Sequence, residues 1–111
     1  MSPSPSVVEL LDSSEAFRAW LRQKTPLGVV GEEGCARCPL ARFLREARPE
    51  ALCRVGRGHF WVAWGRPVEL PAWAASFVRA ADSFMSTLGP RPRIYAHDAL
   101  DLLDEVDGRP G

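Results

Sequence analysis

The sequence lacks several features that would assign a chain to a large class of proteins. Its apolar runs fall far short of the roughly 20 residues that a membrane-spanning helix needs. The Ser/Pro-rich start has neither the basic region nor the apolar core of a secretory signal. Lysine is almost absent, since Lys24 is the only one among 14 basic residues and the others are arginines. The scarcity of lysine carries little functional information, whereas the missing membrane span and secretory signal predict a cytoplasmic protein with no membrane partner.

The motifs of common enzyme classes are also missing. The chain has no G-x-x-x-x-G-K or G-x-G-x-x-G loop for phosphate groups and no G-x-S-x-G nucleophile turn. Its two histidines, His59 and His97, are far apart, and neither is close in sequence to a recognisable nucleophile. We therefore predict a protein that is not an enzyme.

The three cysteines allow three interpretations, and their odd number favours reduced thiols over a disulfide framework. First, Cys35 and Cys38 have the C-x-x-C spacing of thioredoxin-like redox motifs at the start of a predicted helix, but no solid parallel strand precedes them. Second, Cys35, Cys38, Cys53 and His59 provide the ligand types of a closed tetrahedral zinc site. Third, Cys38 is a helix N-cap and Cys53 is a small buried apolar residue.

The apolar pattern predicts a single α+β domain. Residues at helical spacing predict four helices, over 13–24, 39–48, 71–88 and 97–106. Alternating segments predict a hairpin with strands over 52–55 and 59–64, and shorter strands at 29–30 and 94–95. We expect about four helices packed on a short antiparallel hairpin or three-stranded sheet. This domain spans residues 7–106, between flexible tails at 1–6 and 107–111.

Caps and apolar faces refine the predicted helices. Asp12 with Glu15 resembles a capping box at the start of the first helix. The inward faces include Phe17, Trp20 and Leu21 in the first helix, Leu40, Phe43, Leu44 and Ala47 in the second, and a stripe from Trp73 to Leu88 in the third. In the last helix, Asp101, Asp104 and Glu105 are expected to face the solvent.

Charge is unevenly distributed although the formal net charge is zero. Residues 37–66 hold seven arginines against two glutamates, and residues 98–107 hold five carboxylates and no basic residue. The simplest interpretation is two solvated faces, but such segregation also steers a charged partner. The predicted contact residues are Arg42, Arg45, Arg54, Arg57 and Trp61, because Trp and Arg are enriched at binding hot spots. Binding of single-stranded nucleic acid, with Trp61 as a stacking surface, is the alternative.

Three stretches carry a resemblance: Cys38-Pro-Leu-Ala-Arg-Phe-Leu44, Leu70-Pro-Ala-Trp-Ala-Ala-Ser-Phe-Val78 and Ala99-Leu-Asp-Leu-Leu-Asp-Glu-Val106. Together they resemble small proteins of bacteria and their phages over residues 7–106. That group has no known activity, so the resemblance transfers no catalytic residue. It implies a binder or inhibitor of a host protein. The predicted partner is another protein, with a second copy of the chain or a nucleic acid as alternatives, and no cofactor is expected unless the zinc interpretation holds.

Overall fold

A computed structural model describes residues 6–32, 34, 36–63 and 65–108, and it has the α+β fold predicted from the sequence. The longer helices are α2 (Glu15–Arg22), α3 (Pro39–Ala47), α4 (Ala72–Ser86) and α5 (Ala96–Asp107). A single helical turn, α1 (Val7–Leu10), precedes them, and a 3-10 turn covers Pro49–Ala51. Within the described ranges, no helix has the length and apolar character to cross a membrane.

The strands form two small antiparallel sheets. β1 (Val29–Glu32) pairs with β5 (Arg93–Tyr95), and the second sheet has the order β2 (Arg54–Val55), β3 (His59–Trp61), β4 (Val68–Glu69). The predicted hairpin is therefore present as β2 and β3. The sequence pattern did not reveal β4, which is only two residues long. β3 ends at Trp61 because the backbone of Ala63 turns into the left-handed region, with φ of 52°, and its N–H donates to the Ala51 carbonyl.

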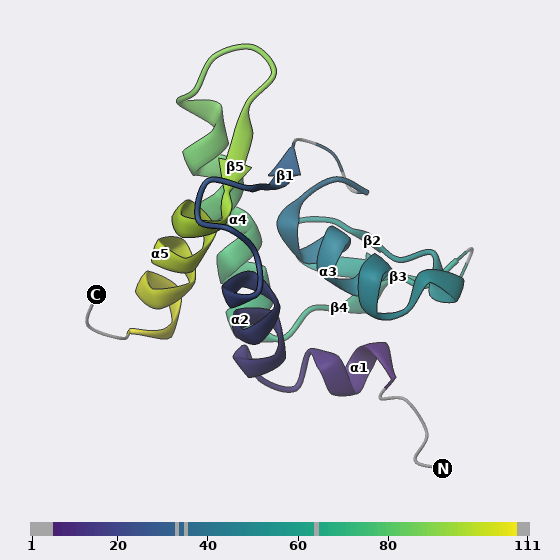
Figure 1. Cartoon of the computed structure of the whole chain (residues 1–111). Helices are drawn as coiled ribbons and strands as arrows, with labels where there is room; N and C mark the ends of the chain where they lie inside the picture. The colour runs from purple at the N-terminus through teal and green to yellow at the C-terminus, as the bar shows by residue number, and fades with distance from the viewer. Residues whose placement is uncertain (1–5, 33, 35, 64, 109–111) are drawn as a thin grey trace.

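The two sheets lie on different sides of the molecule. Figure 1 shows the three-stranded sheet beside α3, and the β1–β5 ribbon beside α4 and α5. α2 contacts both α3 and α5, so it bridges the two parts. The fold therefore has two small sheets on either side of one shared helical core.

An aromatic cluster occupies the centre of this core. The ring of Phe17 on α2 lies 5.4 Å from that of Phe43 on α3 and 4.9 Å from that of Phe77 on α4. Trp20 and Trp73 complete the cluster, with centroids 5.9 and 6.1 Å from Phe17. Edge-to-face and offset aromatic pairs add to the stabilisation from apolar burial. Phe17 therefore joins three helices at a single point.

Several details of the predicted helices are wrong. α2 begins at Glu15 with Ser14 as N-cap, so Asp12 does not form the predicted capping box. Ala47 is exposed, and Leu88 lies beyond the end of α4 with 46% of its surface exposed. The helical spacing of apolar residues identified these helices correctly, but it predicted buried faces that were too long. An apolar residue near the end of a helix can fit the spacing although no neighbouring element covers it.

The last helix does not present all its carboxylates to the solvent, which corrects a further expectation. Arg18 on α2 is buried, and its guanidinium donates to both Asp104 and Asp107 on α5. The Arg18–Asp107 distance is 2.7 Å, and the Ser14 hydroxyl donates to the same Asp107 carboxylate at 2.6 Å. Burial by itself would lower the pKa of Arg18, but the hydrogen bonds and charges of the two aspartates outweigh it and raise this pKa. α5 thus extends through Asp107, which is tied to α2.

Candidate functional site

Two of the three cysteines occupy structural positions. Cys38 is the N-cap of α3, and its sulfur accepts a hydrogen bond from the Ala41 N–H at 3.5 Å. Cys53 is completely buried just before β2, and burial raises the pKa of its thiol. A raised thiol pKa means little thiolate at neutral pH, so Cys53 is poorly suited to nucleophilic chemistry. These two positions match the third interpretation of the cysteines.

The predicted zinc ligands do not form a cluster in the part of the chain that the structure describes. His59 is exposed on β3, whereas Cys53 lies in the core. No group of three or more His, Cys, Asp or Glu side chains suited to a metal ion occurs among the described residues. Cys35 lies outside them, as does Trp64. The four-ligand site therefore stays a prediction.

The exposed face of the β2–β3 hairpin brings together two of the predicted contact residues. Arg54 and Trp61 are cross-strand partners, and the Arg54 guanidinium lies over the Trp61 ring at 5.5 Å from its centroid. The same ring packs on Gly56, where a Cβ atom would come within 3.1 Å of it. Trp61 is therefore half-buried against its own hairpin, with Arg54 held on it by a cation–π contact.

The other predicted arginines have partners of their own. Arg45 on α3 donates to the Cys53 carbonyl at 2.7 Å, which fixes its side chain across the gap between helix and hairpin. Arg42 lies 3.9 Å from the Glu32 carboxylate. Arg57, in the hairpin turn, lies 3.5 Å from Asp82 on α4 but keeps 84% of its side chain exposed. The structure thus places Arg45 beside one pocket with Arg54, which itself contacts Trp61, and it directs Arg42 and Arg57 to other neighbours.

A small pocket lies beside this group. It has a volume of about 180 Å³ and is lined by Arg45, Leu52, Arg54 and Ala63. Leu52, an apolar residue that lines this pocket, is 53% exposed. Both Leu52 and Ala63 have left-handed backbones, with φ of 49° and 52°. Such conformations are costly for residues other than glycine and tend to gather at binding sites. The sequence did not reveal Leu52, because it reads as an ordinary strand residue.

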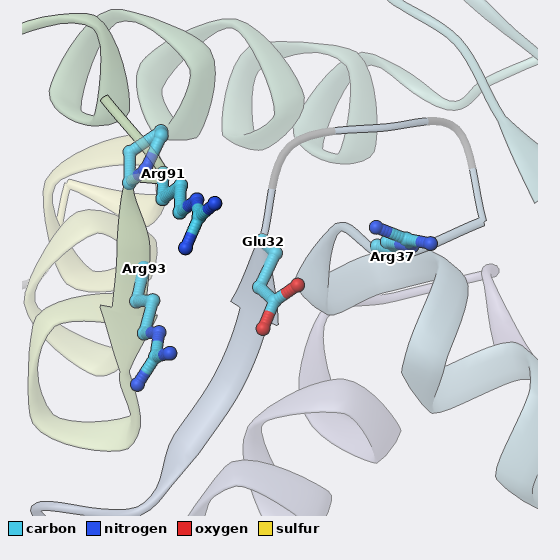
Figure 2. Close-up of a pocket in the computed structure, with 5 residues that line it drawn as sticks. Glu32, Arg37, Arg91 and Arg93 are labelled. Carbon is cyan, nitrogen blue, oxygen red and sulfur yellow. The ribbon is translucent and has the colours of Figure 1, made fainter. Parts of the chain in front are cut away.

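A second and larger pocket lies at the open end of the β1–β5 ribbon. Its volume is about 390 Å³, and it is lined by Glu32, Arg37, Arg91, Pro92 and Arg93. Figure 2 shows Arg91 and Arg93 on one side of Glu32 and Arg37 on the other, just before α3. None of these lining residues was predicted as a site. The alternation of proline and arginine from Pro90 to Arg93 was the available signal, since it places two arginines close together at the start of β5.

Comparison with known proteins gives no relative: no protein-family model, no curated protein and no solved structure matches this chain.

Proposed function

We propose that this chain is a non-enzymatic protein-interaction module that binds its partner through the exposed face of the hairpin. The observation that carries the proposal is an apolar pocket lined by Arg45, Leu52 and Arg54, with Arg54 also lying over the ring of Trp61. Arginine and tryptophan are the residue types most enriched at binding hot spots. The exposed Leu52, which lines the same pocket, adds the apolar contact area that such sites bury.

The side chains around this pocket are held before any partner arrives. Arg45 is fixed by the Cys53 carbonyl, and Arg54 by the Trp61 ring. Ordering a free arginine side chain at an interface costs about 0.5–1.5 kcal/mol, so side chains that are already ordered favour binding. The complementary partner is a protein segment that places one apolar side chain in the pocket and acidic residues opposite the two arginines.

A protein partner fits these features better than single-stranded nucleic acid does. A base that stacked on the face of Trp61 now covered by Arg54 would have to displace that arginine. The pI of about 6.7 is also far below the basic range typical of dedicated nucleic-acid binders. The resemblance to small bacterial and phage proteins extends the proposal: the partner is a host protein, and the chain acts on it as a binder or inhibitor.

The test is capture of partners from a bacterial lysate with the tagged chain and three single variants. Arg54→Glu should weaken capture of a specific partner at least tenfold, because it reverses a charge at the rim of the pocket. Leu52→Asn should weaken it as well, and its fold should be intact because asparagine tolerates the left-handed backbone at this position. Arg22→Glu, an exposed arginine on α2, is the matched charge control and should bind as the parent chain does.

Thermal melts of the variants separate lost binding from lost folding. If Arg54→Glu and Leu52→Asn melt like the parent chain and still capture the same proteins equally well, the hairpin face is not the contact surface. If Arg54→Glu instead abolishes binding to a single-stranded oligonucleotide, the nucleic-acid alternative replaces the proposal.

A further inference from the structure

The pocket at the end of the β1–β5 ribbon is strongly positive and independent of the hairpin face. Arg37, Arg91 and Arg93 are all exposed, and none forms an ion pair within the described ranges of the chain. Among the residues that the structure describes, Glu32 is the one acidic residue that lines the pocket. Its carboxylate is already close to Arg42, at 3.9 Å, on the α3 side. Three guanidinium groups therefore surround a space that holds one partly compensated carboxylate.

The backbone around the pocket is held in place by its neighbours. The Glu32 N–H donates to the Arg37 carbonyl at 2.9 Å, and Glu32 pairs with Arg93 across the ribbon. Gly31 allows β1 to approach the start of α3 so closely that a Cβ atom would lie 2.4 Å from Pro39. All three arginines are thus attached to segments whose relative positions are fixed by hydrogen bonds or close packing.

The backbone of Arg91 adds a second indication. Its φ is 55°, a left-handed conformation, and it precedes a proline, which further disfavours helical backbone angles. Pro92 is buried, whereas Arg91 and Arg93 on either side of it are exposed. The buried proline anchors the segment, and the strained arginine before it extends toward the same pocket as the arginine after it (Figure 2). Strain of this kind at a residue other than glycine is concentrated at functional sites.

From this geometry we infer that the Glu32/Arg37/Arg91/Arg93 pocket binds the phosphoryl group of a small phosphorylated molecule. Among the described lining residues, three arginines against one glutamate leave two positive charges, which match a phosphate monoester with a charge of about −1.5 to −2 at neutral pH. Planar guanidinium groups bind phosphate oxygens with paired hydrogen bonds, and a single carboxylate could satisfy only one such fork. The volume of about 390 Å³ exceeds that of a lone phosphate and lies in the range of small-molecule sites.

The test is titration of the full chain by calorimetry with AMP, adenosine, inorganic phosphate, sulfate and citrate. AMP should bind with a dissociation constant below about 1 mM, and adenosine should not bind. Inorganic phosphate that binds as tightly as AMP would identify the free anion as the ligand, whereas tighter binding of AMP would identify a phosphorylated small molecule. Lowering the pH below about 6 should weaken AMP binding, because the phosphate monoester takes up a proton there.

Variants test whether the pocket residues carry the binding. Arg93→Gln should weaken AMP binding about tenfold or more, since charge-assisted hydrogen bonds are lost, and Arg93→Lys should lie between Gln and Arg. Glu32→Gln should tighten binding, because it removes the one opposing charge. Arg22→Gln, which removes an exposed arginine on α2, is the matched control and should bind AMP like the parent chain.

Four results would overturn the inference. The first is that no phosphate compound binds at 10 mM, roughly the limit of a meaningful affinity, and the second is that Arg93→Gln and Arg22→Gln lose AMP affinity equally. The third is that citrate or sulfate binds as tightly as AMP at every pH. The fourth is that an oligonucleotide displaces AMP at a far lower concentration than AMP itself requires. The last result would assign the pocket to a nucleic-acid backbone. The hairpin variants and the pocket variants change different residues. A failure of phosphate binding would therefore not contradict the proposed protein interaction.

Discussion

Removal of the buried Arg18 should destabilise the fold by about 3 kcal/mol. Its side chain is 3% exposed, and its partners Asp104 and Asp107 are 27% and 14% exposed. Breaking a buried ion pair by deleting one partner costs about 3–5 kcal/mol, because the remaining charge is left without compensation. Asp104 keeps about a quarter of its side chain in water, so we expect the lower end of that range. This is a large part of the roughly 5–15 kcal/mol that stabilises a typical domain.

The measurement is urea unfolding of Arg18→Met, which keeps much of the side-chain volume while removing the charge. The matched control is Lys24→Met, which breaks the more exposed pair with Glu46 and should cost less than about 1 kcal/mol. Adding Asp104→Asn and Asp107→Asn to Arg18→Met should recover part of the lost stability, because the uncompensated charges are then gone. A loss below about 1 kcal/mol for Arg18→Met, or strictly additive effects in the triple variant, would refute the reasoning.

Three further predictions concern the core, the β1–α3 contact and metal binding. Phe77→Ala should cost about 3–5 kcal/mol in the same urea assay, whereas Leu88→Ala should cost less than about 1 kcal/mol because Leu88 is 46% exposed; equal losses would mean that the aromatic cluster is not the core. Gly31→Ala should lower the melting temperature, since its new Cβ atom would overlap Pro39, and an unchanged melting curve would contradict this close approach. Metal analysis of the purified chain should find well under one zinc per chain; stoichiometric zinc together with a sharp drop in melting temperature on chelation would establish the Cys3His site instead.

The helices could be predicted because their apolar faces are long relative to one turn. Phe17, Trp20 and Leu21 are buried as their spacing indicated, and so are Phe77 and Val78 on α4. Apolar residues recur at helical spacing over the 8 residues of α2 and the 15 residues of α4, which is enough to identify both helices. The N-cap role of Cys38 was also among the predicted interpretations, because Pro39 marks the first helical residue.

The sheets and the pockets could be predicted only in part. β4 has two residues, which is too short for any alternation to appear. The pairing of β1 with β5 depends on where the helices between them place the chain, and no local pattern records that. Arg18 on its own reads as a solvated arginine, because its two aspartates lie almost at the other end of the sequence. The arginine pocket could not be predicted for the same reason, because its residues come from three segments that are separated in the sequence.

The ties between the two ends of the chain also determine the order in which it can fold. Asp104, the partner of Arg18, is synthesised 86 residues after it. β1 likewise cannot pair with β5 until residues 93–95 have been synthesised. A nascent chain that lacks these residues therefore carries an uncompensated arginine on α2 and an open strand edge at β1. Contacts so distant in sequence slow folding, because the intervening loop must close before they are gained. We therefore expect the hairpin and α3 to form early, and the native state to be completed in one late step when α5 docks on α2.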